Sequence, residues 1–285
     1  MSVASGWRSP QSPRPVDAPA LQNPANIRGW LTGMSNADKV GLIDRLDTQA
    51  LLGEQVLVLQ ISGDWAHVAV PGQPSPLDPR GYPVWIPIRQ LTALPPPHSD
   101  VSVTVTTPTA WLSFAGTRLE VSFGTTLPLL GRQGASDIVG LPGGATATVS
   151  GTSVAPAPLT GGANAILATA RSFLGLPYLW GGTSGFGFDC TGLIHVIFKA
   201  HGVTVPRDSD PQSRFGVAVS RAGLQPGDLV FFSSQGTAYH AAVYAGSGMV
   251  IDSPSPGYAV EEVPMNSMPN IADFSGARRV IPEPA

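Results

Sequence analysis

Two proline-rich stretches divide this chain of 285 residues. Residues 94–97 are Leu-Pro-Pro-Pro, and residues 155–158 are Ala-Pro-Ala-Pro with two glycines shortly after them. Proline can neither continue a helix nor donate to a strand ladder, so such runs mark boundaries between folded units. At roughly 150 residues per domain the length favours two domains, or three small ones. We predict three units, which cover residues 1–97, 98–160 and 161–285.

The first unit combines a wrapping segment, helical patterns and strands. Residues 1–24 are rich in Pro, Ser and Ala and are expected to wrap a surface. Residues 27–34 and 36–46 show helical patterns, the second capped by Ser35 or Asn36. Alternating apolar residues bounded by turn residues then predict strands over 55–61, 65–70 and 84–87. Short strands with tight turns and one long loop favour a small barrel.

The second unit repeats this small-barrel pattern without a clear sequence repeat. Its predicted strands are residues 101–105, 110–114, 118–123, 126–130 and 145–149. The third unit differs, because helices are predicted first and strands later. The helices cover residues 164–174 and 190–200, and the strands 228–232, 239–244 and 249–252. This order indicates an α+β domain.

Cys190 is the single cysteine, so no intrachain disulfide can form. It stands where a glycine-rich loop, residues 181–187, enters a predicted helix. A thiol at a helix N-terminus feels the positive end of the dipole and deprotonates more readily. A nearby imidazole would complete its activation as a nucleophile. The alternative is an inert, buried cysteine.

His240 and Asp252 could complete a catalytic set with Cys190. His240 lies on a predicted strand downstream of the cysteine, and Asp252 ends the next strand. Cysteine, then histidine on a strand, then a polar orienting residue is the order of papain-like enzymes. The alternatives are a structural histidine and an ordinary strand-end aspartate. His195 lies about 140° from the apolar stripe of its helix, so we expect it to be peripheral.

Charge and hydropathy exclude several function classes. Sixteen basic and nineteen acidic residues give a net charge of −3 without a basic block, so nucleic-acid binding is not expected. No run of about 18 apolar residues predicts a membrane span. Histidine and cysteine spacing predicts no metal site, and no cofactor is expected. Residues 1–24 contain no apolar signal-peptide core, so we expect a cytoplasmic protein, or a secreted one if an export signal has been removed. The oligomeric state stays open.

Five motifs occur in the third unit in a specific order. They are PYLWGG at 177–182, DCTGL at 189–193, PRDS at 206–209, QPGDLVFF at 225–232, and His240 with Val243-Tyr244. Together they resemble the NlpC-type cysteine peptidases, which hydrolyse peptide bonds in bacterial cell-wall stems. The resemblance covers about residues 162–283 and implies a papain-like α+β catalytic domain without cofactor or metal.

The resemblance assigns roles to individual positions. Cys190 matches the nucleophile, His240 the base, and Asp252 the third polar residue, which is often His in this family. Tyr178 matches a tyrosine beside the nucleophile. The resemblance also implies further substrate-binding positions: Asp189, Thr191, which replaces the commoner Ser, and Ser209.

The N-terminal part resembles a narrower group, the γ-D-glutamyl-L-diamino-acid endopeptidases. The matching segments are residues 7–10, 17–20, 53–54, 63–65 and 81–87. This group implies two bacterial SH3-like barrels ahead of the catalytic domain, the first of which closes one end of the cleft. The implied partner is a peptidoglycan stem peptide, L-Ala-γ-D-Glu-diamino acid, with a free N-terminal amine. Its amine would be held by Asp208 and Glu54, with Tyr82 closing over the L-Ala methyl.

Three functions are compatible with these residues. The first is a peptidase that cuts the γ-D-glutamyl–diamino acid bond of free stem peptides, in murein recycling or trimming. The second is a broad cell-wall hydrolase that acts on intact peptidoglycan, and the third is a non-catalytic cell-wall binding protein. The diamino acid, meso-diaminopimelate or lysine, stays open.

The hairpin after His240 constrains the site. For His240 and Asp252 to meet, Ala242 must stand opposite Asp252, so that His240 is the same-face diagonal neighbour of Asp252. A loop centred on Gly246-Ser247 would pair Tyr244 with Met249 and send the two side chains to opposite faces. We therefore predict the other register, in which a three-residue loop of Gly246, Ser247 and Gly248 pairs Ala245 with Met249, or an equivalent bulge.

Overall fold

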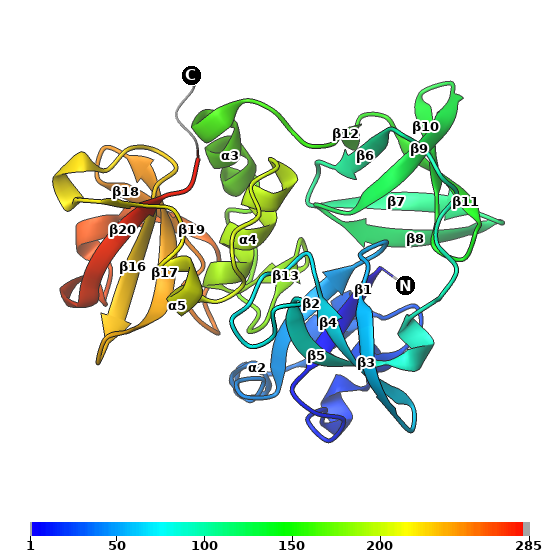
Figure 1. Ribbon diagram of the computed structural model, residues 1–285, viewed down its shortest axis with the longest axis horizontal. Helices are drawn as coiled ribbons and strands as arrows, with labels where there is room; N and C mark the ends of the chain where they lie inside the picture. The colour runs from blue at the N-terminus through cyan, green and yellow to red at the C-terminus, as the bar shows by residue number, and fades with distance from the viewer. Residues whose placement is uncertain (1, 282–285) are drawn as a thin grey trace.

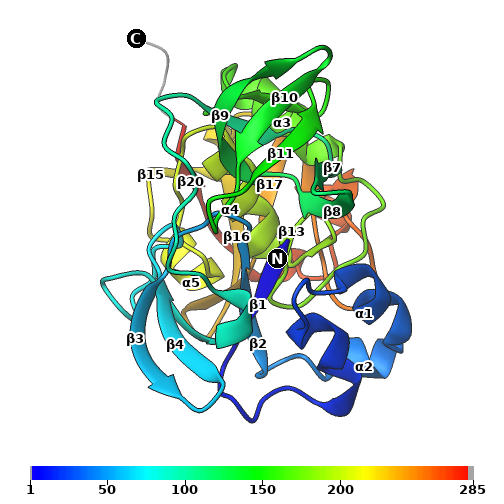
Figure 2. The same ribbon diagram turned by 90° about the vertical axis from the view of Figure 1, so that its right-hand side faces the viewer.

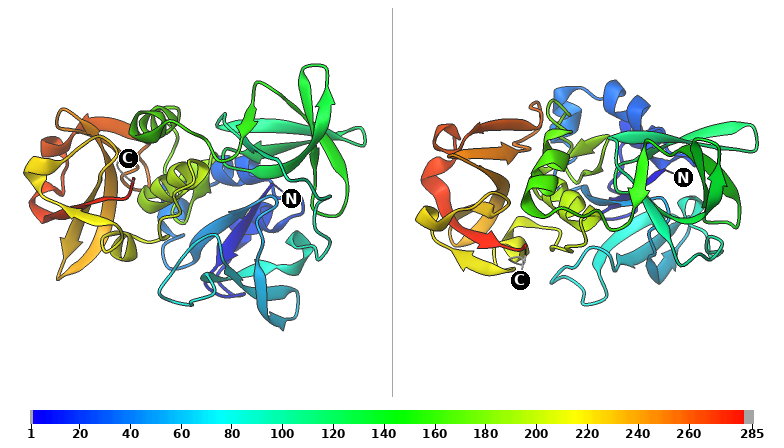
Figure 3. Two further views of the ribbon diagram at one scale, coloured as in Figure 1. Left: turned by 45° about the horizontal axis from the view of Figure 1, so that its top comes forward. Right: turned by 90° about the horizontal axis from the view of Figure 1, so that it is seen from above.

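A helix that begins at Cys190 lies at the centre of the molecule (Figure 1). The computed structural model describes residues 2–281. A six-stranded antiparallel sheet covers one side of this helix, and two further β units lie on the other side. Figure 2 shows the two β units one above the other, with helices α1 and α2 at the outer edge of the lower one. Figure 3 shows the central helix between the six-stranded sheet and both of the other β units.

The first unit runs from β1 to η2. Its elements are β1 (Val3–Trp7), η1 (Pro15–Leu21), α1 (Ile27–Gly33), α2 (Asn36–Val40), β2 (Leu46–Leu51), β3 (Leu57–Ser62), β4 (Trp65–Val70), β5 (Tyr82–Pro87) and η2 (Ile88–Gln90). The strand order is β2-β1-β5-β4-β3. Strands β1 and β2 are not among the elements predicted from the sequence. The expected wrap at residues 1–24 contains a buried strand, and the helix expected over 36–46 ends at Val40.

The second unit runs from β6 to β12. Its strands are β6 (Ser102–Val105), β7 (Thr109–Phe114), β8 (Thr117–Ser122), β9 (Thr126–Gln133), β10 (Ser136–Gly140), β11 (Thr146–Ser150) and β12 (Val154–Pro156). They form one sheet in the order β12-β6-β9-β10-β11-β7-β8. The five expected strands are present, and β10 and β12 are additional.

The third unit contains the central helix and the six-stranded sheet. Its helices are α3 (Gly162–Arg171), α4 (Cys190–Ala200), α5 (Ser209–Gln212), η3 (Arg221–Gly223), η4 (Met265–Ser267) and η5 (Ile271–Asp273). Its strands are β13 (Thr183–Ser184), β14 (Gly187–Phe188), β15 (Val217–Val219), β16 (Leu229–Ser234), β17 (Thr237–Gly246), β18 (Met249–Asp252), β19 (Glu261–Pro264) and β20 (Phe274–Arg279). The strand order of the six-stranded sheet is β15-β20-β16-β17-β18-β19.

The expected architecture of two SH3-like barrels ahead of a papain-like domain is wrong. The first β unit is a five-stranded sheet whose order is open between β2 and β3, and the second is a seven-stranded sheet open between β12 and β8. Local patterns predict where strands form. Whether a sheet closes into a barrel depends on pairing between its edge strands, which lie far apart in the sequence. The unit limits at residues 97 and 160 stay a prediction.

The units share their hydrophobic cores. Leu179 and Phe186 of the third unit pack in one cluster with Trp7 of the first. Phe123, at the end of β8, packs edge-on against Phe173, with ring centroids 5.2 Å apart. Helix α4 is therefore covered on every side, which corrects the expectation for His195. That residue is 1% exposed, because the helix has no solvent face on which it could lie.

Candidate active site

Cys190 is the first residue of α4, as the sequence predicts, and is partly exposed. Asp189 caps the helix by accepting a hydrogen bond from the Gly192 amide at 2.7 Å. Gly192 is required at this point, because an added Cβ would lie 1.9 Å from the Gly182 carbonyl oxygen. The thiol thus stands at the positive end of α4, where a thiolate is stabilised.

The imidazole of His240 lies between two acidic groups. Its Nε2 atom is 2.9 Å from Asp252 Oδ1, and both residues are buried. Burial disfavours the imidazolium ion, but the charges of Cys190 and Asp252 and their hydrogen bonds to the ring outweigh it and raise the pKa of His240. The arrangement therefore favours a protonated His240 imidazole beside the Cys190 sulfur.

The hairpin between β17 and β18 brings these side chains together. Val243 pairs with Ile251 and Tyr244 with Val250, and a bulge at Ala245 then lets Gly246 pair with Met249. Continued by one residue, this register sets Ala242 opposite Asp252. The predicted register is confirmed, through the bulge rather than a three-residue loop, and Asp252 faces His240.

A cleft of about 360 Å³ opens beside Cys190. The third unit contributes Tyr178, Trp180, Asp189, Cys190, Thr191, Arg207, Asp208, Ser209 and Tyr239. The first unit contributes Arg8, Asp47, Leu77 and Tyr82. The cleft is thus built jointly by two units that are far apart in the sequence.

Tyr178 is buried in the wall of this cleft. Burial and the nearby negative groups of Cys190 and Asp189 raise the pKa of its hydroxyl, despite an opposing effect of Arg207. The hydroxyl therefore stays protonated and can donate a hydrogen bond.

Asp208 and Tyr82 meet across the boundary between the units. The Tyr82 hydroxyl donates to Asp208 Oδ1 at 3.4 Å. Although Asp208 precedes α5, its carboxylate makes no capping hydrogen bond to that helix. Burial raises the pKa of Asp208, and the carboxylates of Asp189 and Asp47 add to this effect while Arg207 opposes it. An incoming cation would relieve this unfavourable burial.

Glu54 is not in the cleft, which corrects the prediction that it binds the substrate amine. It forms an ion pair with Lys199 of α4 and accepts a hydrogen bond from the Leu51 amide at 2.9 Å. Asp47, on β2, is the acidic residue that the first unit does place in the cleft. Arg8 holds its carboxylate at 2.8 Å. Asp47 was not predicted as a cleft residue because strand β2, on which it lies, was not predicted from the sequence.

The remaining predicted residues lie in the cleft wall but are engaged in structural contacts. Thr191 Oγ1 donates to Asp189 Oδ1 at 3.1 Å. Ser209 Oγ donates to the Ala238 carbonyl at 2.7 Å. Tyr239, which the sequence did not single out, is the extra residue of a β-bulge between β16 and β17, and its hydroxyl donates to Asp273 at 2.6 Å. Bulges of this kind re-aim side chains beside active sites.

Within residues 2–281, no group of three or more His, Cys, Asp or Glu side chains is placed to hold a metal ion. No helix in that part of the chain is long and apolar enough to cross a membrane.

Comparison with known proteins gives consistent results. The NlpC/P60 family model matches residues 175–279. A gamma-D-glutamyl-L-lysine dipeptidyl-peptidase of Bacillus cereus (strain ATCC 10987 / NRS 248) is 44% identical over 302 residues, which cover 99% of this chain and 90% of that protein. The protein of that name from Bacillus subtilis (strain 168) is 38% identical over 289 residues, 99% of this chain and 98% of that one.

The fold also matches a solved structure. The crystal structure of an NlpC/P60 family protein from Bacillus cereus ATCC 10987 superposes with a TM-score of 0.93 at 42% identity, over 98% of this chain and 97% of that one. All three units are therefore part of the matching architecture.

Proposed function

The chain belongs to the NlpC/P60 family of cysteine peptidases, and on that premise we propose that it hydrolyses the γ-D-glutamyl–diamino acid bond of peptidoglycan stem peptides with a free N-terminal L-Ala. The names of the two full-length relatives support this substrate, with lysine as a diamino acid that it accepts. The product would be the dipeptide L-Ala-D-Glu. A requirement for a free amine supports a role in recycling or trimming released fragments.

One observation carries the specificity: the carboxylates of Asp208 and Asp47, which come from different units, both line the cleft beside Cys190. A substrate ammonium buried here needs paired negative charge, because its desolvation would otherwise make binding unfavourable. Tyr82, buried beside Asp208, supplies an apolar ring for the L-Ala methyl group. A binding site for the N-terminus at a fixed place would set the cut at a fixed distance from it.

The chemistry follows from the groups beside the thiol. The Cys190 thiolate attacks the γ-carbonyl carbon of D-Glu, and the oxyanion accepts hydrogen bonds from the Cys190 amide and the Tyr178 hydroxyl. The His240 imidazolium protonates the departing α-amine of the diamino acid, which leaves a thioester on Cys190. Neutral His240 then takes a proton from water, whose attack releases the dipeptide and restores the thiolate.

The test compares L-Ala-γ-D-Glu-L-Lys with its N-acetylated form, with products identified by mass spectrometry. We expect wild type to prefer the free amine strongly. Asp208→Ala should lower kcat/KM on the free peptide by about a hundredfold or more, since removing one partner of a buried ion pair costs about 3–5 kcal/mol. Acetylation should then have little additional effect in the variant.

Equal cleavage of both peptides by wild type would contradict the proposal. Efficient release of fragments from intact cell wall would instead favour a broad wall hydrolase. A protein that cleaves neither peptide, with unreactive Cys190, would favour a binding protein.

A further inference from the structure

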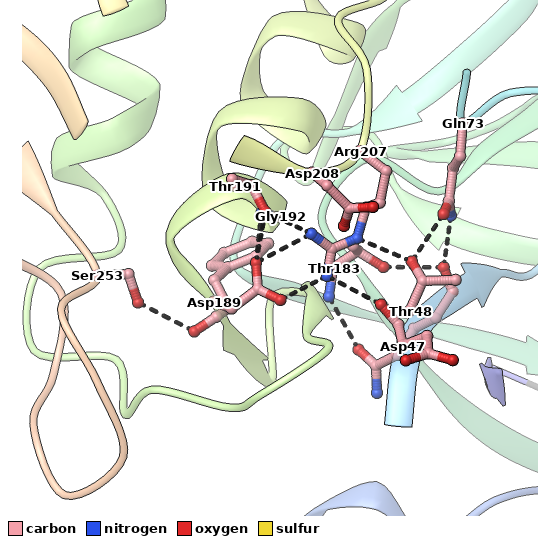
Figure 4. Close-up of polar contacts among 12 residues, drawn as sticks. Asp47, Thr48, Gln73, Thr183, Asp189, Thr191, Gly192, Arg207, Asp208 and Ser253 are labelled. Atoms are coloured by element: carbon pink, nitrogen blue, oxygen red, sulfur yellow. Dashed lines mark hydrogen bonds and ion pairs between the residues drawn. The ribbon is translucent and has the colours of Figure 1, made fainter. Parts of the chain in front are cut away.

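The guanidinium of Arg207 lies between Asp189 and Thr191 on one side and Asp47 and Thr48 on the other (Figure 4). Arg207 is 1% exposed. On one side its Nη1 donates to Asp189 Oδ1 at 3.1 Å and to Thr191 Oγ1 at 2.6 Å, and its Nη2 pairs with Asp189 Oδ2 at 2.5 Å. Asp189 is the cap of α4 and directly precedes Cys190. This side of the guanidinium therefore holds the start of the nucleophile helix.

The other side of the guanidinium reaches β2. Its Nε donates to Thr48 Oγ1 at 3.0 Å, and its Nη2 donates to the Asp47 carbonyl at 3.3 Å. The guanidinium is planar and rigid, so its donors keep a fixed separation. Asp47, whose carboxylate lies in the cleft, is thereby connected through a rigid group to the residue before Cys190.

Thr48 uses both hydrogen-bonding capacities of its hydroxyl. It accepts from Arg207 and donates to Gln73 Oε1 at 2.7 Å. Gln73 in turn donates from Nε2 to the Gln49 carbonyl at 2.7 Å. Thr48, Gln49 and Gln73 are each at most 1% exposed. Such a buried network is rigid only while every member keeps its partners.

Gln49 fastens the same strand to the loop before Cys190. Its Oε1 accepts from the Thr183 amide at 3.2 Å and from Ser184 Oγ at 2.8 Å. Its carbonyl accepts from Thr183 Oγ1 at 2.8 Å. Strand β2 is thus bound to the third unit on both sides of Thr48, by contacts that span more than a hundred residues of sequence.

We propose that Thr48 is a specificity-determining positioning residue, which acts through Arg207 and Gln73 to fix the distance from the Asp47 carboxylate to Cys190. The inference rests on the proposed function, because it concerns how the amine end of the substrate is held. Thr48 does not line the cleft beside Cys190. Its loss should therefore impair recognition of the N-terminus while the chemistry at Cys190 continues.

The test uses Thr48→Val, which keeps the shape of the side chain but removes the hydroxyl, and Thr48→Ser as the matched control. Each variant is assayed on L-Ala-γ-D-Glu-L-Lys and on its N-acetylated form, and Cys190 is alkylated with iodoacetamide. In Thr48→Val we expect KM for the free peptide to rise about tenfold, as for the loss of one buried hydrogen bond to a charged group. The kcat value for the free peptide, the rate of Cys190 alkylation and the rate of cleavage of the acetylated peptide should each change by less than about twofold. Thr48→Ser, which keeps the hydroxyl, should retain the wild-type preference for the free amine.

Gln73→Met provides a second test that leaves Arg207 and its contact with Thr48 in place. It should lower the free-amine preference in the same direction. Gln90→Met is its control, because Gln90 is also buried and donates to the Ala20 and Gln22 carbonyls, away from the cleft. This variant should lower thermal stability without changing the preference.

The outcomes separate the inference from the proposed function. If wild type prefers the free amine and Thr48→Val keeps the full preference, the positioning role is wrong while the function stands. If both peptides lose activity equally in Thr48→Val and Gln73→Met, the network is merely structural and the inference is also overturned. If wild type itself has no preference, both ideas fail.

Discussion

At the scale of single residues, the site depends on a charge balance around one imidazole. His240 contacts Asp252 on one side and Cys190 on the other, with all three groups withdrawn from bulk water to different degrees. Burial alone would remove the proton from the ring. The two acidic partners keep it there, so the protonated imidazole depends directly on Asp252.

Asp252→Asn should therefore lower the pKa of His240, because it removes one of the charges that raise it. The imidazolium would lose its proton at lower pH, and the alkaline limb of kcat/KM should move to lower pH. Iodoacetamide alkylation of Cys190, followed across the same range, should show the same displacement. Identical pH profiles in wild type and Asp252→Asn would remove Asp252 from the mechanism.

Tyr178 allows a second prediction at this scale. Because the pKa of its hydroxyl is raised, it is a donor throughout the working pH range. If it binds the oxyanion, Tyr178→Phe should lower kcat by about a hundredfold with a much smaller change in KM. Tyr244→Phe is the control, since the Tyr244 hydroxyl accepts from the Gly248 amide in the hairpin turn. Equal kinetics for both variants would exclude the oxyanion role.

At the scale of elements, the segment that contains β2 connects the cleft to helix α4. Its beginning carries Asp47 into the site, and beyond its end Glu54 pairs with Lys199 on α4. The two carboxylates thus have different tasks, although they belong to the same segment. Asp47 lines the cleft, and Glu54 fastens the first unit to helix α4.

Glu54→Gln should accordingly affect stability rather than recognition. We expect a loss of about 1 kcal/mol in the free energy of unfolding, in keeping with a partly exposed ion pair. The ratio of free-amine to acetylated cleavage should stay near the wild-type value. Asp47→Asn should show the opposite pattern. A collapse of the ratio in Glu54→Gln would restore the sequence-based role of Glu54 in binding the amine.

At the scale of the whole molecule, the second unit supports the nucleophile loop from outside the cleft. The Gly185 amide donates to Ser122 Oγ at 2.8 Å. An added Cβ at Gly185 would lie 2.0 Å from the Pro108 carbonyl oxygen. The loop and the second unit are therefore in contact too close for any side chain.

Gly185→Ala should destabilise the protein by about 1–3 kcal/mol, the usual consequence of overpacking a tight contact. Urea unfolding measures this effect, and Cys190 alkylation reports whether the loop has moved. Gly131→Ala is the control, since nothing lies within 4 Å of an added Cβ there. Equal urea midpoints for Gly185→Ala and Gly131→Ala would show that the loop can shift to make room for the added methyl group.

The sequence by itself determined the local features of this protein. A glycine-rich loop before an amphipathic helix predicted Cys190 at the start of α4, and the hairpin argument predicted the register that joins His240 to Asp252. These depend on neighbours in the chain, where periodicity and turn chemistry are informative. Helix α4 and strands β4 and β18 were predicted at their observed limits for the same reason.

Only the tertiary structure decided how the units close the cleft. Strand β2 forms because β1, over forty residues earlier, pairs with it, so Asp47 could not be foreseen as a cleft residue. Glu54 had an available cation, Lys199, that lies 145 residues away. The burial of His195 likewise follows from contacts between units. Pairing and burial of this kind are set by long-range packing, which the local pattern of a sequence does not encode.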